Sequence, residues 1–462
     1  MKRYGWLFVF LLIAAAMIII SIQVINKGTA PIVEATATQT EKKVELVFMN
    51  SWGGLDGRAQ LMQDLLDEFM AQNPGVTVKN GSVFGDDFLP SIKTRFALGD
   101  DPDVFGLWPG SDIRSLIEAG KVAELTALID AAPDDNGQYS VYGSCPLGSS
   151  NKADSYVPTQ TSLAFKHSFN KEMWQYVTFD NRVYGLPVEI IFEALFVNTD
   201  IFEQYELEVP TTYEQLLKAV RVLRGKGVIP IAYNSEAEGS YLYQNLVMMT
   251  GGKQGVENPI QNGRVSDCYI QAMYLMRELY QNGAFPEDYY TLTSSERNNL
   301  FTQKKAAMLV QGSWFIPDVV SDPSVDIIPF PTVSDTQTAS DMVYGMGCGI
   351  FYASNKAMRD PNKTAAVQKL LRFLASEQTA AQLAEQTGMI SNVDIEKYDI
   401  TYNRLTQKGL SLVNTANALV GPADSFIDRT VWEDYIIKQF PHMLQGRVSP
   451  EQLWTDAIKA NE

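Results

Sequence analysis

A long apolar run enclosed by turn residues constrains this chain more than any other stretch. It extends from Tyr184 to Asp200, with Gly185 and Pro187 at its start and Asn198-Thr199-Asp200 at its end. Turn residues on both sides of aliphatic and aromatic residues are typical of a β-strand. The run therefore predicts a strand with a defined beginning and end.

The two faces of this predicted strand differ in chemistry, because side chains alternate across a strand. One face is wholly apolar and comprises Val188, Ile190, Phe192, Ala194 and Phe196. The other face carries two carboxylates, Glu189 and Glu193, among apolar neighbours. A buried charge without a partner is costly, so we expect each Glu to meet a donor, a cation, water or a ligand. A carboxylate satisfied within the fold, or an exposed strand edge, is the alternative for either residue.

Length and charge limit the classes of function. The chain has 462 residues, more than one core usually holds, which predicts two lobes. Its formal net charge is −17, so it supplies no basic stripe for nucleic acid and is repelled by anionic membrane surfaces. An uncharged ligand is the partner that this charge favours.

Histidines and cysteines are too few and too scattered for a metal centre. His167 and His442 lie far apart, and Cys145, Cys268 and Cys348 form no C-x-x-C motif. A structural zinc site or a His-based triad requires more ligands, or closer ones. We therefore expect no metal and no other cofactor, and we interpret the cysteines as small buried hydrophobic residues.

The N-terminus predicts export. Residues 1–25 place Lys2 and Arg3 before an apolar run that is long enough, at about 20 residues, to span a bilayer. The segment is a signal peptide or a membrane anchor, and the sequence favours a retained anchor over cleavage and secretion. Residues 26–43 have no periodic apolar pattern and are interpreted as a flexible tether.

Strand and helix patterns alternate through the remaining chain, which predicts largely parallel α/β sheets with ligand loops at the strand ends. Predicted strands include residues 44–49, 101–108 and 228–233. Residues 133–160 are rich in Gly, Ser, Asp and Asn, and are interpreted as an insertion or a long surface loop.

Several blocks resemble, in the same order, the family 1 extracellular solute-binding proteins of ATP-binding-cassette (ABC) importers. The resemblance is to the maltodextrin-binding-like, carbohydrate-binding cluster. It is carried by E-L-V-F-M-N-S-W-G-G from residue 45, D-P-D-V-F from 101, I-R-S-L-I-E-A-G-K-V-A-E-L-T from 113, Y-G-L-P-V-E-I-I-F-E-A-L-F-V-N-T-D-I-F from 184 and K-K-A-A-M-L-V-Q-G-S-W-F from 304. One departure is the absence of the lipid-anchoring cysteine that the family commonly carries after its apolar segment.

The resemblance implies a hinged two-lobe α/β fold of the periplasmic-binding-protein type II, often called a Venus flytrap, with a ligand cleft between the lobes. Residues 184–200 would then be the first crossing between lobes. We expect the N-lobe to comprise residues 44–191 and 306–344, and the C-lobe to comprise 192–305 and 345–462.

Three tryptophans are candidate platforms for a sugar, whose ring faces are weakly polar and favour flat aromatic surfaces. Trp52, Trp108 and Trp314 each occupy a Gly- or Pro-containing loop directly after a predicted strand. Each is equally plausible as a packing residue of the core. The resemblance supports Trp52 and Trp314 more directly than Trp108.

Carboxylates and phenols are the candidate hydrogen-bonding partners of sugar hydroxyls. We predict Glu189 and Glu236 as acceptors, with Tyr241 and Tyr344 as secondary candidates. For Glu236 a solvated loop carboxylate is an equal alternative.

The resemblance and the composition together predict an extracellular carbohydrate-binding protein, not an enzyme. We expect a monomer that delivers its ligand by lobe closure to an ABC permease in the membrane. A membrane-tethered sensor ectodomain is one alternative. A secreted glycosidase is another, but Glu189 and Glu193 would lie roughly 13 Å apart on a regular strand, whereas glycosidase carboxyl groups lie roughly 5 to 9.5 Å apart.

Overall fold

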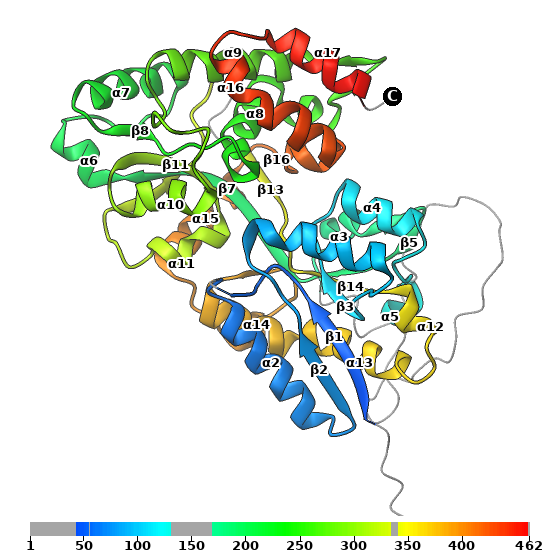
Figure 1. The fold of residues 1–462 in the computed structure, drawn as a ribbon. Coiled ribbons are helices and arrows are strands. Elements are labelled where there is room, and N and C mark those ends of the chain that lie inside the picture. Colours follow the sequence, from blue (N-terminus) through cyan, green and yellow to red (C-terminus); the bar gives the residue numbers. More distant parts are fainter. Residues whose placement is uncertain (1–42, 55, 131–168, 334–340, 461–462) are drawn as a thin grey trace, which may run out of the picture. The chain divides into compact units, whose positions relative to one another are not determined.

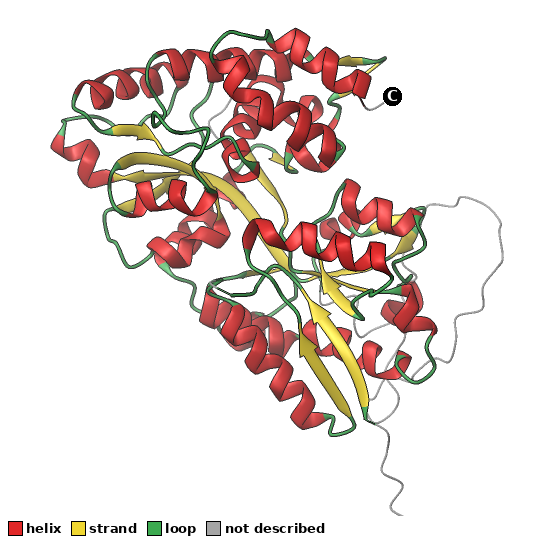
Figure 2. Ribbon diagram, viewed as in Figure 1, coloured by secondary structure: helices red, strands yellow, loops and turns green. Residues whose placement is uncertain are grey.

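A computed structural model describes residues 43–54, 56–130, 169–333 and 341–460. Their strands form two larger sheets and two short hairpins, with helices packed around them (Figure 1, Figure 2). The predicted N-terminal signal or anchor, its tether up to residue 42 and the insertion at 133–160 lie outside these ranges. Within the ranges, no helix has the length and apolar character needed to cross a bilayer.

The first sheet has the strand order β2-β1-β3-β14-β6. These strands are β2 (Val76–Asn80), β1 (Val44–Met49), β3 (Val104–Gly106), β14 (Ile350–Ala353) and β6 (Gly185–Pro187). β1 is parallel to β2 and β3, whereas β14 is antiparallel to both β3 and β6. A strand from late in the chain therefore joins strands from its beginning.

The helices nearest in sequence to the first sheet present one apolar face each. They are α2 (Ala59–Gln72), α3 (Phe88–Leu98), α4 (Ser111–Glu118), α5 (Thr126–Asp130), α12 (Asn355–Arg359), α13 (Thr364–Leu374) and α14 (Glu377–Thr387). In α2 the buried side chains include Leu61, Leu65 and Phe69, which recur at helical spacing. Each fully buried Leu or Phe contributes about 1.5–3 kcal/mol through the hydrophobic effect.

The second sheet has the order β16-β13-β7-β11-β8, and β12 and β15 also pair with β7. Its strands are β16 (Leu419–Val420), β13 (Met342–Met346), β7 (Glu189–Asn198), β11 (Ala306–Gly312), β8 (Ile229–Ile231), β12 (Val325–Ile328) and β15 (Ile390–Ser391). The hairpins are β4 (Thr178–Phe179) with β5 (Arg182–Val183), and β9 (Ile260–Gln261) with β10 (Arg264–Val265). The remaining helices are α6 (Thr199–Gln204), α7 (Tyr213–Gly225), α8 (Ser240–Glu257), α9 (Asp267–Gln281), α10 (Ser294–Thr302), α11 (Ile316–Val319), α15 (Arg404–Thr415), α16 (Phe440–Leu444) and α17 (Pro450–Ala460).

β7 is the strand predicted from the apolar run, and all ten of its residues are buried. The buried apolar side chains divide into two clusters, and β7 contributes to both. The apolar face predicted from alternation packs entirely in the first cluster: Val188, Ile190, Phe192, Ala194 and Phe196. Leu195 and Val197 on the opposite face pack in the second cluster. The predicted division of the strand into two faces is therefore confirmed.

The strand pairings contradict two of the expected segment assignments. Residues 306–344 were expected in the N-lobe, but β11 pairs with β7 and β8 of the second sheet. Residues 345–462 were expected in the C-lobe, but β14 belongs to the first sheet, and α13 packs against β1, β3 and β14 of that sheet. The chain thus returns to the first sheet at β14, three strands later than expected, through the turn at 347–349 between β13 and β14.

Candidate functional site

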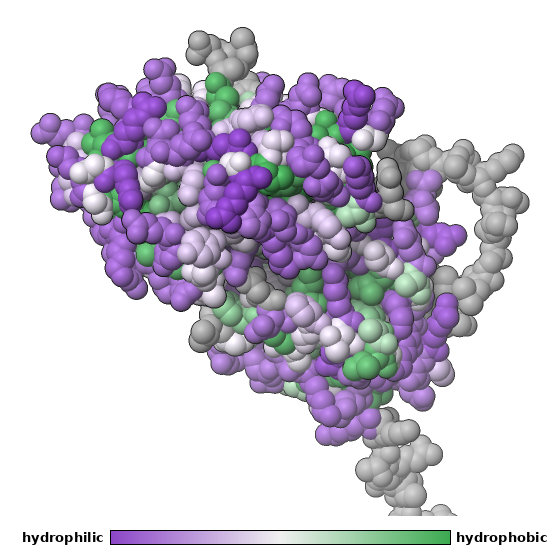
Figure 3. Space-filling view, turned by 45° about the horizontal axis from the view of Figure 1, so that its top comes forward, coloured by the Kyte–Doolittle hydropathy of each residue, from purple (hydrophilic) through white to green (hydrophobic). Residues whose placement is uncertain are grey.

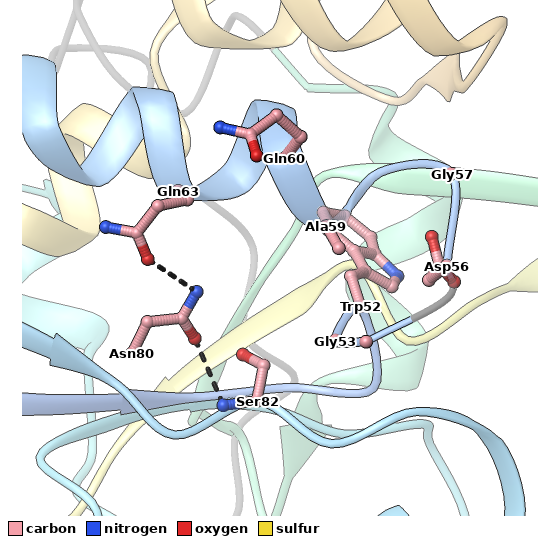
Figure 4. Close-up of a pocket in the computed structure, with 10 residues that line it drawn as sticks. Trp52, Gly53, Asp56, Gly57, Ala59, Gln60, Gln63, Asn80 and Ser82 are labelled. Carbon is pink, nitrogen blue, oxygen red and sulfur yellow. Dashed lines mark hydrogen bonds between the residues drawn. The ribbon is translucent and has the colours of Figure 1, made fainter.

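A polar cavity of about 330 Å³ opens beside the loop between β1 and α2 (Figure 4). Its wall carries three amides, one hydroxyl, one carboxylate and one indole, together with glycines and one alanine. The lining residues are Trp52, Gly53, Gly54, Asp56, Gly57, Ala59, Gln60, Gln63, Asn80 and Ser82. The volume lies at the lower end of the range for small-molecule sites, roughly 300–1,000 Å³.

One wall of the cavity is a chain of hydrogen bonds from the end of β2 to α2. The Asn80 amide donates to Oε1 of Gln63 over 3.2 Å, and the Ser82 backbone N–H donates to Oδ1 of Asn80 over 3.0 Å (Figure 4). These bonds orient the two amides without using all of their hydrogen-bonding capacity. The wall can therefore still donate to and accept from an uncharged polar ligand.

Trp52 lies on the other side of this cavity and is itself fully buried. The Arg58 guanidinium lies 4.6 Å from its ring centroid, and Phe351 meets it edge-on at 6.1 Å. Its indole N–H is buried without a hydrogen-bond acceptor among the described residues. Arg58 and Phe351 thus cover much of the indole, and its role as a ligand platform stays a prediction.

Glu189, at the start of β7, is 3 % exposed and has two donors. Arg58 Nη1 donates to Oε1 over 2.9 Å, and the Gly349 backbone N–H donates to Oε2 over 2.9 Å. Burial raises the pKa of Glu189 above its ordinary value, while Arg58 and the Gly349 N–H oppose that shift. A Cβ atom at Gly347 or Gly349 would lie 2.4 Å from this side chain, so both glycines are required for the close approach.

Trp314 and Tyr241 form a second aromatic group. Their rings meet edge-on with centroids 5.5 Å apart, and both side chains are partly exposed. The Trp314 ring lies directly over Gly312, where a Cβ atom would approach it to 2.0 Å. Beside them, Nδ2 of Asn245 donates to Glu193 over 2.7 Å and to the Tyr241 carbonyl over 2.9 Å. This pair offers the exposed aromatic surface that Trp52 lacks.

Trp108 lies in the loop after β3 and is partly buried. Its ring stacks on Phe88 with centroids 5.6 Å apart, and the Arg429 guanidinium lies 5.2 Å from its centroid. Phe88 and Arg429 therefore compete with any ligand for the surface of this indole.

Glu236 and Tyr344 lie in different surroundings from the tryptophans. Glu236 Oε2 accepts from the Ser294 backbone N–H over 3.1 Å, where α10 begins. A carboxylate at a helix N-terminus satisfies a free N–H and interacts favourably with the helix dipole. Tyr344 lines a separate cavity of about 50 Å³ together with Tyr176, and burial raises the pKa of Tyr344 to about 12.

Sequence reasoning missed the residues that connect these groups. Arg58 joins Trp52 to Glu189, and Asn80 and Gln63 form the cavity wall. Their signals were weak: an arginine directly before a predicted helix, and amides at the end of β2 and on α2.

No metal centre is formed within the described ranges, which contain no group of three or more His, Cys, Asp or Glu side chains able to hold an ion. Cys268 and Cys348 are free thiols and both are buried, as expected. Cys145 lies outside the described residues.

The model of one protein family, described as bacterial extracellular solute-binding protein, matches residues 52–381. The chain belongs to this family. The expected identification as a solute-binding protein is confirmed. The matched residues include the cavity lining, β7 and the Trp314–Tyr241 pair.

Two relatives of this solute-binding protein illustrate the relationship. The multiple sugar-binding protein of Streptococcus mutans is 21 % identical over 66 % of this chain and 66 % of its own length. The melibiose/raffinose/stachyose-binding protein MelE of Bacillus subtilis is 23 % identical over 48 % of this chain and 53 % of its own length. The matched regions thus span between about half and two thirds of these relatives, both of which are named as binding proteins and not as enzymes.

Solved structures confirm the fold. A chitin oligosaccharide binding protein superposes with a TM-score of 0.74 at 18 % identity, covering 91 % of this chain and 98 % of that one. The expected two-lobe α/β fold is therefore confirmed.

Proposed function

We propose that this solute-binding protein binds a neutral carbohydrate, releases it unchanged and delivers it to an ABC permease in the membrane. The observation that carries this proposal is the cavity beside Trp52, whose amides and Ser82 hydroxyl suit a ligand rich in hydroxyl groups. The names of the relatives, which bind several saccharides, support the same ligand class.

Binding by lobe closure is the mechanism that we infer. A ligand that contacts both halves only when they approach each other shifts the equilibrium by its difference in affinity for the two arrangements. The Trp52 cavity lies beside the first sheet, and the Trp314–Tyr241 pair belongs to elements of the second. A sugar gripped by both groups would hold the halves together.

Calorimetry against a panel of mono- and oligosaccharides, followed by product analysis, tests this proposal. We expect micromolar or tighter binding of at least one saccharide without turnover. Asn80→Ala and Trp314→Ala should each weaken that binding at least tenfold. Gln72→Ala is the matched control, because Gln72 is exposed at the other end of α2. Hydrolysis of the bound saccharide at enzymatic rates would contradict the proposal.

We also infer that residues 1–25 anchor the protein at the outer surface of the cell, in keeping with the extracellular family. Membrane fractionation tests this inference. The full chain should sediment with membranes, and a chain that begins at residue 44 should not.

A further inference from the structure

Arg429 lies in the segment that follows β16 of the second sheet. Its neighbours in sequence, Ile427 and Val431, pack in the second cluster. The segment that it contacts, 108–112, follows β3 of the first sheet and continues into α4. Contacts of Arg429 with this segment therefore join the two halves of the protein.

Arg429 makes three such contacts. Its backbone N–H donates to Oγ of Ser111 over 2.8 Å, and its Nε lies 3.5 Å from Oδ2 of Asp112. Its guanidinium lies 5.2 Å from the Trp108 ring centroid. In addition, Nη2 lies 2.6 Å from Oε1 of Glu433, four residues further along the same segment.

These contacts respond differently when the two halves separate. The ion pair with Glu433 is local, so it persists when the two halves separate. The contacts with Asp112 and Trp108 exist only when the halves are together. Because the guanidinium keeps one carboxylate partner in either arrangement, separation does not strand an unpaired buried charge, and the contact can form and break repeatedly.

The burial of the contact indicates that it affects the equilibrium between arrangements. The side chains of Arg429 and Asp112 are only 21 % and 14 % exposed. A cation over an indole and a partly buried ion pair are each stronger there than on an open surface. Salt still screens the pair, because neither side chain is fully enclosed.

We propose that Arg429 is a latch residue that favours the closed arrangement of the two halves and thereby positions the site for its ligand. This inference rests on the proposed function only where ligand affinity is concerned. It predicts that closure is partly independent of ligand, and that added salt weakens ligand binding even when the ligand is uncharged.

The test compares Arg429→Met, which keeps the aliphatic stem, with Arg429→Lys, which keeps the charge. Asp112→Asn removes the partner from the other half. Lys438→Met is the matched control, since it removes a positive charge from an exposed ion pair with Asp434, close by on the same half. All variants are made in the full chain with Cys145→Ser, and circular dichroism checks that each one folds.

Spin labels report the distance between halves without any ligand. Suitable sites are Leu98, which is 78 % exposed on α3, and Tyr290, which is 58 % exposed beyond α9. Arg429→Met and Asp112→Asn should move the distance distribution toward longer values, with the ratio of closed to open arrangements falling about tenfold. Arg429→Lys should restore part of the closed population, and Lys438→Met should match the unsubstituted chain.

Ligand affinity gives the second measurement. Between about 20 mM and 0.5 M salt, binding to the unsubstituted chain should weaken severalfold, and this dependence should be lost in Arg429→Met. Unchanged label distances in both Arg429→Met and Asp112→Asn would overturn the latch. If Arg429→Met does not fold, Asp112→Asn alone decides. A sugar panel without any binder would instead contradict the proposed function, and the label distances would still test the latch.

Discussion

Replacing Arg58 by methionine should destabilise the protein by about 3–5 kcal/mol at neutral pH, the usual effect of removing one partner of a buried ion pair. Glu189 is 3 % exposed, and Arg58 is its only cationic partner among the described residues. Without the guanidinium, the carboxylate keeps the Gly349 N–H alone. The expected loss is a large part of a typical unfolding free energy of about 5–15 kcal/mol.

The destabilisation should depend on pH in a defined direction. Burial already holds the folded pKa of Glu189 above its ordinary value of 4.5, and Arg58 is the largest influence that lowers it. The methionine variant therefore raises this pKa further. A carboxyl group with a raised folded pKa binds its proton more tightly in the folded state, so stability is greatest below the ordinary pKa and is lost as pH rises through the folded pKa. The difference between variant and unsubstituted chain should therefore be larger at neutral pH than at about pH 5.

Urea unfolding of four chains measures this effect: the unsubstituted protein, Arg58→Met, Glu189→Gln and the double variant. Glu189→Gln removes the charge that Arg58 neutralises, so the double variant should recover at least half of the loss. Arg58→Met and the double variant both lose the contacts of Arg58 with Asp56 and Trp52. The double-mutant cycle therefore isolates the contribution of the Arg58–Glu189 ion pair. A cost below about 1 kcal/mol for Arg58→Met, or no recovery in the double variant, would refute the reasoning.

Two further substitutions test the surroundings of the predicted acceptors. Gly349→Ala places a Cβ atom 2.4 Å from Glu189 and should lower the free energy of unfolding, measured in urea, by about 1–3 kcal/mol. Gly225→Ala is the control: no atom lies within 4 Å of the added Cβ, so this substitution should be neutral or slightly stabilising. Glu236→Ala removes the acceptor of the Ser294 N–H and should lower the free energy of unfolding by about 1 kcal/mol; a loss of ligand affinity with unchanged stability would show that Glu236 serves the ligand instead of α10.

The sequence predicted local structure well because local structure depends on local patterns. The alternation in β7 assigned its apolar face correctly, since the same five side chains pack in one cluster. The sheet that β11 joins could not be predicted in this way. Residues 306–310 are all apolar, so they fit either sheet, and only the pairing with β7 and β8 decides between them.

The positions of the tryptophan loops were predictable from the sequence, but their contacts were not. The loops that carry Trp52 and Trp314 do lie at the ends of β1 and β11. That Trp52 is covered by Arg58, and that Glu189 is paired with the same arginine, depends on contacts between residues that the sequence pattern does not connect. The same holds for Trp314, which is partly exposed and whose ring lies over Gly312.

The place of β14 in the first sheet has a consequence for biosynthesis. β14 lies between β3 and β6, so this sheet stays split until residue 353 has been translated. Pairings between such distant segments form slowly, because a long loop must close before any contact rewards it. The strands of the first sheet therefore remain incompletely paired for most of synthesis. In that state, a chain destined for the cell exterior can still be threaded through a membrane pore.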